Sequence, residues 1–194
     1  MKIAVLGAGH VGPVLARLAL GAGHEVAIAG SGDPSRIEMI VGFLAPGAKA
    51  LTAAGAVADA DLVVLALPWH RFSSLEPGAF AGKVVVDAMN HWPPSAEPLG
   101  TSEQVAARLA GADVVKSLNH VAYQDMDPAA GRAVGVAGDS PGAVEVVASF
   151  LRDIGFDPVP VGPLAAGRLL EPGSPLFGGA ARRQEFETHT KEQS

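Results

Sequence analysis

Three glycines near the start of the chain, Gly7, Gly9 and Gly12, separate a strand-type segment from a helix-type segment. A second strand-type segment follows the helix, and this β-α-β context makes the glycine spacing more specific than it is alone. Gly7 permits a tight turn, Gly9 leaves space for a phosphate group, and Gly12 lets the helix pack closely on the strand. The pattern predicts a Rossmann unit that holds the pyrophosphate of a dinucleotide at a helix N-terminus. The residues expected to contact it are Gly7, Ala8, Gly9, His10, Val11 and Gly12.

The end of the second strand bears on the choice between NAD and NADP. Proteins that bind NAD usually place a carboxylate there for the ribose hydroxyls, and this chain has Gly30. Ser31 can donate to a 2′-phosphate, and Arg36, one turn into the next helix, could supply a positive charge. Asp33 is the competing feature, because it could accept from the ribose or could, with Pro34, only begin that helix. The segment favours NADP and leaves NAD possible.

Polar and aromatic residues follow three later strand-type segments. In an open α/β sheet, the loops at the carboxyl ends of the strands converge on the ligand. We expect Leu67, Pro68 and Trp69 beside the nicotinamide ribose, although Trp69 fits a half-buried packing position equally well. Asn90 would contact the cofactor, and its amide or that of Asn119 could bind the carboxamide or a second ligand, although a loop asparagine more often stabilises its own turn. The residues expected near a second substrate are His70, His91, Trp92, Asn119 and His120.

The sequence contains no pattern typical of a catalytic triad, a metal site or a carboxylate pair. Hydride transfer between two bound rings needs alignment and exclusion of water, and no acid or base of the protein that performs covalent work. A carbonyl or imine substrate would need a proton donor, and His120 or His91 would be the candidates.

Strand-type and helix-type segments alternate along most of the chain. This predicts a Rossmann-type α/β fold, with a doubly wound, mostly parallel sheet and a short C-terminal helical appendage. One domain is expected over residues 1–177, followed by a polar tail over 178–194. The expected strands are 2–6, 25–29, 62–67, 83–87, 113–117, 133–137 and 157–161. The expected helices are 11–22, 33–43, 102–110 and 141–154, the last with a capping signature at Ser140 and Pro141.

Composition excludes several classes of function. The 194-residue chain has a formal charge of −6 and no basic run, which argues against a nucleic-acid partner. It has no cysteine, so disulfides and thiolate chemistry are excluded. No apolar run has the length of a membrane span and no signal-peptide pattern is present. These features predict a cytoplasmic protein with a small-molecule redox substrate and no membrane or nucleic-acid partner.

From Met1 to about Phe177, the chain resembles the F420-dependent NADP oxidoreductase family, small Rossmann enzymes that pass hydride between NADP(H) and the deazaflavin coenzyme F420. Besides the glycine turn, the residues that carry the resemblance are Ala66-Leu67-Pro68-Trp69, Val84-Val85-Val86-Asp87, Val114-Val115-Lys116-Ser117-Leu118-Asn119, Gly138-Asp139, Gly162-Pro163-Leu164 and Arg168-Leu169-Leu170-Glu171. The resemblance implies NADP as cofactor and coenzyme F420 as co-substrate. It also implies a homodimer, with residues 175–186 as the expected contact. The alternative interpretation of this segment is a helix that closes one end of its own sheet.

Two departures from that family keep other functions open. Members that prefer NADP often have Arg after the serine, where this chain has Gly32, and Trp92 and His91 add bulk near the expected deazaflavin. An NAD(P)H-dependent reductase of a carbonyl, imine or flavin is one alternative, although related enzymes usually add a helical domain. A non-catalytic NAD(P)-binding sensor is another. Metalloreductases with a similar nucleotide domain carry membrane helices, which we do not expect here.

Overall fold

The computed structural model describes residues 1–94, 99–126, 131–179 and 181–192. Within these ranges eight strands form one sheet in the order β3-β2-β1-β4-β5-β6-β7-β8. All neighbours run parallel except β6 and β7, which are antiparallel, so the predicted mostly parallel sheet is confirmed. The strands are β1 (Lys2–Leu6), β2 (Glu25–Ala29), β3 (Lys49–Ala50), β4 (Leu62–Leu65), β5 (Val84–Asp87), β6 (Asp113–Lys116), β7 (Ala133–Gly138) and β8 (Asp157–Gly162).

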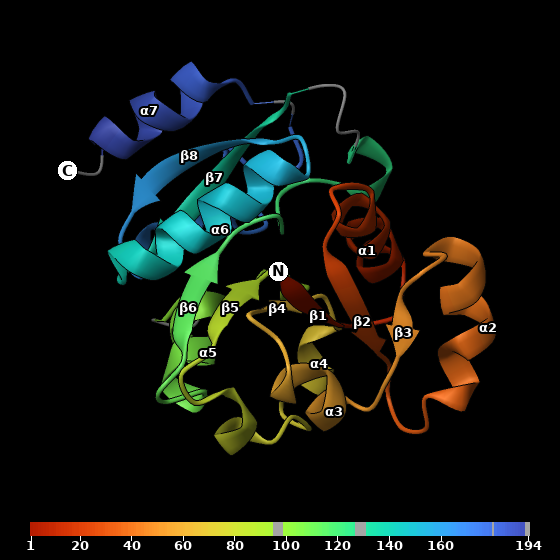
Figure 1. The fold of residues 1–194 in the computed structure, drawn as a ribbon. Coiled ribbons are helices and arrows are strands. Elements are labelled where there is room, and N and C mark those ends of the chain that lie inside the picture. Colours follow the sequence, from red (N-terminus) through yellow and green to blue (C-terminus); the bar gives the residue numbers. More distant parts are fainter. Residues whose placement is uncertain (95–98, 127–130, 180, 193–194) are drawn as a thin grey trace.

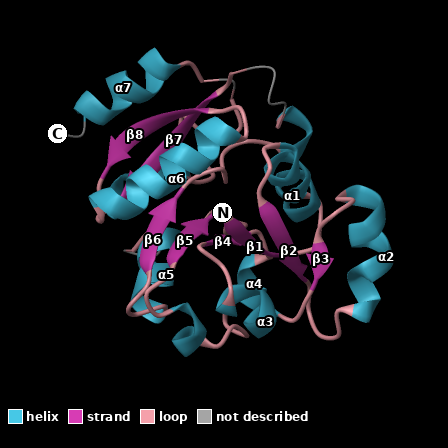
Figure 2. Ribbon diagram, viewed as in Figure 1, coloured by secondary structure: helices cyan, strands magenta, loops and turns pink. Residues whose placement is uncertain are grey.

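Helices cover both faces of this sheet (Figures 1 and 2). The α-helices are α1 (Val11–Gly21), α2 (Ser35–Leu44), α3 (Ala53–Ala58), α4 (Trp69–Phe72), α5 (Thr101–Arg108), α6 (Pro141–Asp153) and α7 (Arg183–Glu192). Short 3-10 helices are η1 (Pro77–Phe80), η2 (Tyr123–Asp125) and η4 (Leu164–Leu170). The capping signature predicted for α6 is confirmed, because the Ser140 hydroxyl accepts from the Ala143 amide at 3.4 Å.

The central strands are apolar on successive residues because each face meets a different layer of helices. In β1, Ile3 and Val5 pack with α1 and α6, whereas Ala4 and Leu6 pack with α3 and α5. Strands buried on both faces need apolar residues at every position. The two layers fix the positions of the strand ends, where the loops of the site begin.

Short and capped segments account for the elements that the pattern missed. β3 has two residues at the sheet edge, and α3 is a six-residue helix begun by Thr52, whose hydroxyl accepts from the Gly55 amide at 3.1 Å. The helix predicted from residue 33 begins at Ser35 instead, because the Asp33 carboxylate accepts the Ser35 amide at 2.9 Å. The strand predicted over 62–67 ends at Leu65, where the chain turns toward the site.

The C-terminal segment packs on its own chain. Leu176 and Phe186 are each 1% exposed and lie in an apolar cluster with residues of β7, β8 and η4. Leu176 and Phe186, two apolar side chains of the expected dimer contact at residues 175–186, are thus covered by their own chain, which fits the alternative of a helix closing the sheet. Residue 180, and residues 193–194 of the predicted tail, lie outside the described residues.

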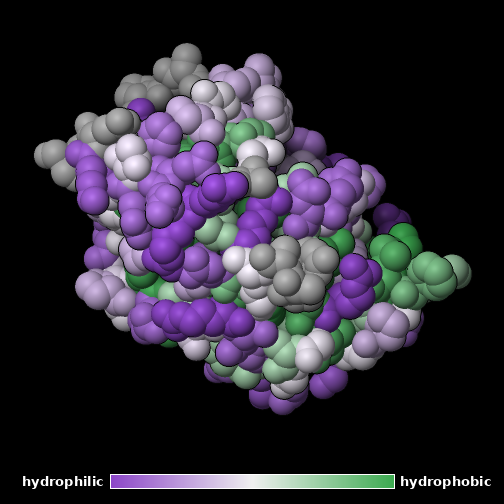
Figure 3. Space-filling view, turned by 90° about the horizontal axis from the view of Figure 1, so that it is seen from above, coloured by the Kyte–Doolittle hydropathy of each residue, from purple (hydrophilic) through white to green (hydrophobic). Residues whose placement is uncertain are grey.

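Helix α2 stands at the edge of the molecule with apolar side chains on its surface. Met39 and Phe43 are 85% and 82% exposed, and Figure 3 shows hydrophobic side chains at that end. Of its ten residues Val41 is the buried one. The part of α2 that reaches the site is its first turn, where Ile37 packs against Gly30.

Along the described ranges, no helix combines the length and the apolar character needed to cross a membrane.

Candidate functional site

A cavity of 670 Å³ lies at the carboxyl ends of β1, β2, β4 and β5. These strands flank the point where the strand order reverses, which is where open α/β sheets bind their ligands. Its volume is in the range of cofactor pockets. The lining residues are Leu6, Gly7, Ala8, Gly9, His10, Val11, Ala29, Gly30, Ser31, Ile37, Ala53, Ala66, Leu67, Pro68, Arg71, Ser74, Leu75, Ala88, Met89, Asn90, Trp92 and Tyr123.

The glycine turn has the geometry of a phosphate cradle. Gly7 has φ 132°, and a Cβ there would lie 2.2 Å from the Ala66 carbonyl oxygen. A Cβ on Gly12 would lie 1.8 Å from the Gly7 carbonyl oxygen. A Cβ on Gly9, by contrast, would meet no atom within 4 Å, so this residue leaves open space beside the first turn of α1. The residues present therefore fit the pyrophosphate of NADP, which the unpaired amides of the turn would bind.

The end of β2 places Ser31 in the cavity and leaves Arg36 outside it. Gly30 and Ser31 line the cavity, whereas Arg36 is exposed and does not. Asp33 is also outside the lining. The amide hydrogen bond from Ser35 is the main cause of a lowered pKa at Asp33, so this carboxylate is engaged in the turn that precedes α2. The interpretation of Asp33 as the start of a helix fits the structure better than a ribose acceptor.

The turn after β4 contributes Leu67 and Pro68 to the cavity, but not Trp69 or His70. Trp69 is half-buried and stacks on Phe72, with ring centroids 5.7 Å apart. It takes the packing role that the sequence left open. His70 is exposed on the same helix and does not line the cavity.

Arg71, Ser74 and Leu75 also line the cavity and were missed. The one sequence feature that could have indicated these three residues is that they follow closely after the carboxyl end of β4.

The loop after β5 brings Asn90 and Trp92 to the cavity. The Asn90 side-chain amide donates to the Asn119 carbonyl oxygen at 2.8 Å, and the Asn119 amide donates to Asn90 Oδ1 at 3.0 Å. Asn119 is 5% exposed and lies behind Asn90, outside the lining. His91 also lies outside, with its Nδ1 2.7 Å from the Pro93 carbonyl oxygen. Trp92 is 63% exposed, so it forms a wall open to solvent.

His10 and Tyr123 form one wall together. Their rings stack with centroids 5.0 Å apart and an interplanar angle of 20°. Tyr123 begins η2, at the end of the loop after β6, and sequence reasoning did not single it out. His10 therefore contributes a ring contact beside the glycine turn.

A buried ion pair stabilises the start of the loop after β5. Lys116 and Asp87 are 0% exposed, and Lys116 Nζ lies 3.0 Å from Asp87 Oδ2. The same ammonium donates to the Met89 carbonyl oxygen and to Thr101 Oγ1, each at 2.9 Å. The Asp87 carboxylate also accepts from the Met89 amide at 3.0 Å and the Ser102 hydroxyl at 2.7 Å. This network holds Met89, and with it the start of the cavity loop.

His120, a predicted proton donor, belongs to the core. It is 2% exposed, its Nε2 accepts from the Gly135 amide at 3.2 Å, and its ring meets Phe186 edge-on. Burial, then the positive charges of Lys116 and Arg132, lower the pKa of His120 to about 3. A neutral imidazole outside the cavity lining cannot protonate a substrate there, so the structure does not support that role.

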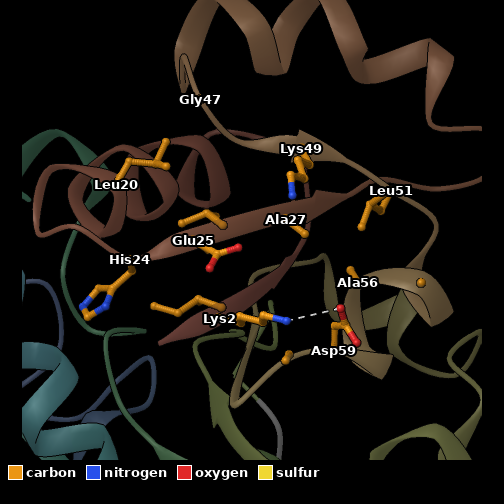
Figure 4. Close-up of a pocket in the computed structure, with 14 residues that line it drawn as sticks. Lys2, Leu20, His24, Glu25, Ala27, Gly47, Lys49, Leu51, Ala56 and Asp59 are labelled. Atoms are coloured by element: carbon orange, nitrogen blue, oxygen red, sulfur yellow. Dashed lines mark hydrogen bonds and ion pairs between the residues drawn. The ribbon is translucent and has the colours of Figure 1, made fainter.

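A second cavity, of 260 Å³, lies at the opposite edge of the sheet, at the amino ends of β1 and β2 (Figure 4). Lys2, Glu25, Lys49 and Asp59 are its charged residues. Figure 4 shows Lys2 directed at Asp59, and this 3.5 Å pair joins side chains that are 50% and 85% exposed. Exposed pairs contribute little energy. Because ligands of this fold bind at the carboxyl ends, we assign the nucleotide to the larger cavity.

Comparison with known proteins identifies chains that are similar to this one in sequence and in fold. The family described as NADP oxidoreductase, coenzyme F420-dependent, matches residues 2–91. A protein from Arthrobacter sp. FB24, proposed to be an F420-dependent NADP reductase, is 30% identical, with a TM-score of 0.76 and 87% of each chain covered. The hypothetical protein SMa0349 from Sinorhizobium meliloti is 30% identical, with a TM-score of 0.81, and the match covers 92% of this chain and 94% of that one.

A curated relative is much longer than this chain. Metalloreductase STEAP3 of Rattus norvegicus is 30% identical in an alignment of 179 residues, and the match covers 88% of this chain and 36% of the rat protein. The chain thus spans 36% of that relative's length. The two bacterial structures, in contrast, are matched over nearly their full length, and the family match contains the glycine turn, β4, β5 and Asn90. The chain therefore belongs to the coenzyme F420-dependent NADP oxidoreductase family, as its sequence predicts.

Proposed function

We propose that the protein transfers a hydride between NADP(H) and coenzyme F420. The observation that carries the proposal is a cavity with a dinucleotide cradle at one end and Asn90, Trp92 and Tyr123 lining it as well. NADP(H) supplies or accepts the hydride, and the deazaflavin takes the other end of the transfer. The family match supports the same pair of coenzymes.

The lining residues suit a hydride transfer that uses no acid or base of the protein, in which the proton gained by the reduced deazaflavin comes from solvent. Among the described residues, the titratable side chains of the lining are those of His10, Arg71 and Tyr123, and none of these lining residues has a carboxylate. His91 and His120, the donors that a carbonyl or imine substrate would need, both lie outside the lining. The work left to the protein is to hold two rings about 3–3.5 Å apart and to exclude water. Apolar residues of the strand ends, such as Leu67, Ala88 and Met89, provide such walls.

Asn90 is the residue we expect to orient the nicotinamide. Its two hydrogen bonds with Asn119 fix the side chain, and each of its polar atoms can still make one more hydrogen bond. A carboxamide offers one donor and one acceptor group, which matches what Asn90 has left. Trp92 and Tyr123 are the aromatic surfaces available to a second ring.

The test measures both coenzymes in one assay. Purified protein is mixed with NADPH or NADH, with and without coenzyme F420, and the absorbance of each coenzyme is followed. NADPH-dependent reduction of the deazaflavin, slower with NADH, is the expected result. Tight nucleotide binding without reduction of coenzyme F420 would overturn the proposal. In that case a screen of carbonyl, imine and flavin substrates separates another reductase from a sensor, which would consume no nucleotide with any acceptor.

A further inference from the structure

Among the residues that the structure describes, Arg71 is the one permanently charged side chain lining the nucleotide cavity. From this and the observations that follow, we infer that Arg71 binds the 2′-phosphate of NADP(H) and sets the preference over NAD(H). The inference rests on the proposed nucleotide site. A phosphate monoester is the ligand class that an arginine guanidinium binds best, through paired charge-assisted hydrogen bonds.

The strand order places Arg71 across the cavity from the end of β2. β2 and β4 are the two neighbours of β1, and the glycine turn lies between their ends. Ser31 follows β2, Arg71 lies in α4 just after β4, and both line the cavity. A nucleotide whose pyrophosphate lies on the glycine turn extends its adenosine half toward β2. Its ribose then lies between the Ser31 hydroxyl and the Arg71 guanidinium.

The backbone of Arg71 is fixed while its guanidinium is uncommitted. The Arg71 amide donates to the Pro68 carbonyl oxygen at 2.8 Å, and the Ser74 hydroxyl donates to the Arg71 carbonyl oxygen at 2.7 Å. Phe72, the next residue, is 5% exposed and anchors the helix. In the described ranges the guanidinium has no hydrogen bond or ion pair, unlike Arg108, which donates to the Ser73 and Leu75 carbonyl oxygens. A fixed backbone and a guanidinium without a protein partner suit the binding of a phosphate group on the ligand.

Arg36, the cation expected from the sequence, is less suited. Arg36 and Arg71 are both exposed, but Arg36, on α2, is absent from the lining, and Gly32 stands where the family often has an arginine. We infer that Arg71, on the opposite side of the cavity, supplies the positive charge that an arginine at the position of Gly32 would otherwise provide. The competing role for Arg71 is stacking on the adenine ring, which would serve NAD(H) and NADP(H) equally.

The experiment compares two fragments that differ in the 2′-phosphate alone. Isothermal titration calorimetry measures the Kd of 2′,5′-ADP and of 5′-ADP for the wild type, Arg71→Gln and Arg71→Lys. We expect Arg71→Gln to weaken 2′,5′-ADP roughly 10- to 100-fold, since a charge-assisted phosphate contact is lost. The Kd of 5′-ADP should change by less than about twofold, and Arg71→Lys should retain part of the preference. Arg36→Gln and Arg17→Gln, at exposed arginines outside the cavity, are the matched controls and should bind like the wild type.

Several results would overturn the inference. If Arg71→Gln weakens the binding of both fragments equally, Arg71 contacts the adenine. If Arg36→Gln selectively weakens 2′,5′-ADP, the phosphate belongs to Arg36. If Arg71→Gln changes neither Kd, Arg71 has no role in binding. Equal melting temperatures of the variants show that the comparison concerns binding. Because the fragments carry no nicotinamide, a selective effect of Arg71→Gln stands even if coenzyme F420 is not reduced.

Discussion

Asn90 and Asn119 hold each other through two reciprocal hydrogen bonds, of 2.8 and 3.0 Å, across the carboxyl ends of β5 and β6. Asn90 faces the cavity, and Asn119 lies behind it and donates also to the Leu170 carbonyl oxygen at 2.5 Å. Leu118, between β6 and Asn119, has φ 67°, an uncommon conformation for a branched residue. Backbone strain of this kind persists where the surrounding structure demands it. Leu118 directly precedes Asn119, which makes both hydrogen bonds with Asn90.

The first prediction separates the two asparagines. Asn119→Ala leaves the Leu170 carbonyl without its donor and should lower the free energy of unfolding by about 1–3 kcal/mol. Asn90→Ala should cost less stability and should lower kcat for hydride transfer while leaving the Kd of 2′,5′-ADP unchanged. Urea unfolding, calorimetry and turnover are the measurements. In the double variant the two stability losses should not add, because the residues share their hydrogen bonds. Additive losses would show that the pair is not coupled.

The second prediction contrasts two glycines of the same turn. Gly9→Ala adds a methyl group where no protein atom lies within 4 Å, and Gly9 is not in the left-handed region. Its stability should stay equal or rise by up to about 1 kcal/mol, while nucleotide Kd rises roughly tenfold or more. Gly12→Ala would force a methyl group against the Gly7 carbonyl oxygen and should fail to fold stably. Thermal melts and nucleotide titrations check both, and unchanged nucleotide binding in Gly9→Ala would contradict the cradle.

The third prediction concerns the buried ion pair below the loop. Lys116→Met leaves the Asp87 carboxylate buried without its cation and should cost roughly 3–5 kcal/mol of unfolding free energy. Lys2→Met breaks an exposed pair with Asp59 and should cost less than about 1 kcal/mol. Urea denaturation of both variants provides the comparison. A loss in Lys116→Met as small as that in Lys2→Met would mean that the network does not hold the loop.

The sequence pattern predicted the sheet and the position of the glycine turn between a strand and a helix, because both depend on local spacing. Gly7, Gly9 and Gly12 have different conformational requirements, and each can be inferred from the residues beside it. What the pattern could not give is the direction of side chains in short elements. His70 was chosen where Arg71 lines the cavity, and a shift of one residue turns a helix by about 100°. In a helix of four residues, no periodicity exists to fix that rotation.

The same limit applies to the loops after β5 and β6. Asn90, Asn119 and His120 all follow strands, as predicted, but their burial depends on contacts far away in the chain. Asn119 is covered through Leu170, and His120 through Gly135 and Phe186. Those partners lie 15 or more residues along the chain, so the spacing of the histidines alone could not show that they are core residues.

The last prediction uses the buried His120 as a source of acid sensitivity. Its pKa is about 3 in the folded protein, lowered mainly by burial, and about 6.5 in an unfolded chain. Between these values the unfolded chain binds a proton that the folded protein does not, so stability rises with pH across that range. The contribution is complete above pH 6.5 and is lost as the pH falls toward 3, with a slope of up to about 1.4 kcal/mol per pH unit. His120→Gln, which retains an acceptor for the Gly135 amide, should remove this slope from urea unfolding between pH 4 and 6.5. The exposed His70→Gln variant is the control and should keep the wild-type slope. If His120→Gln retains it too, His120 already carries its proton in the folded protein, and the neutral core imidazole described above is wrong.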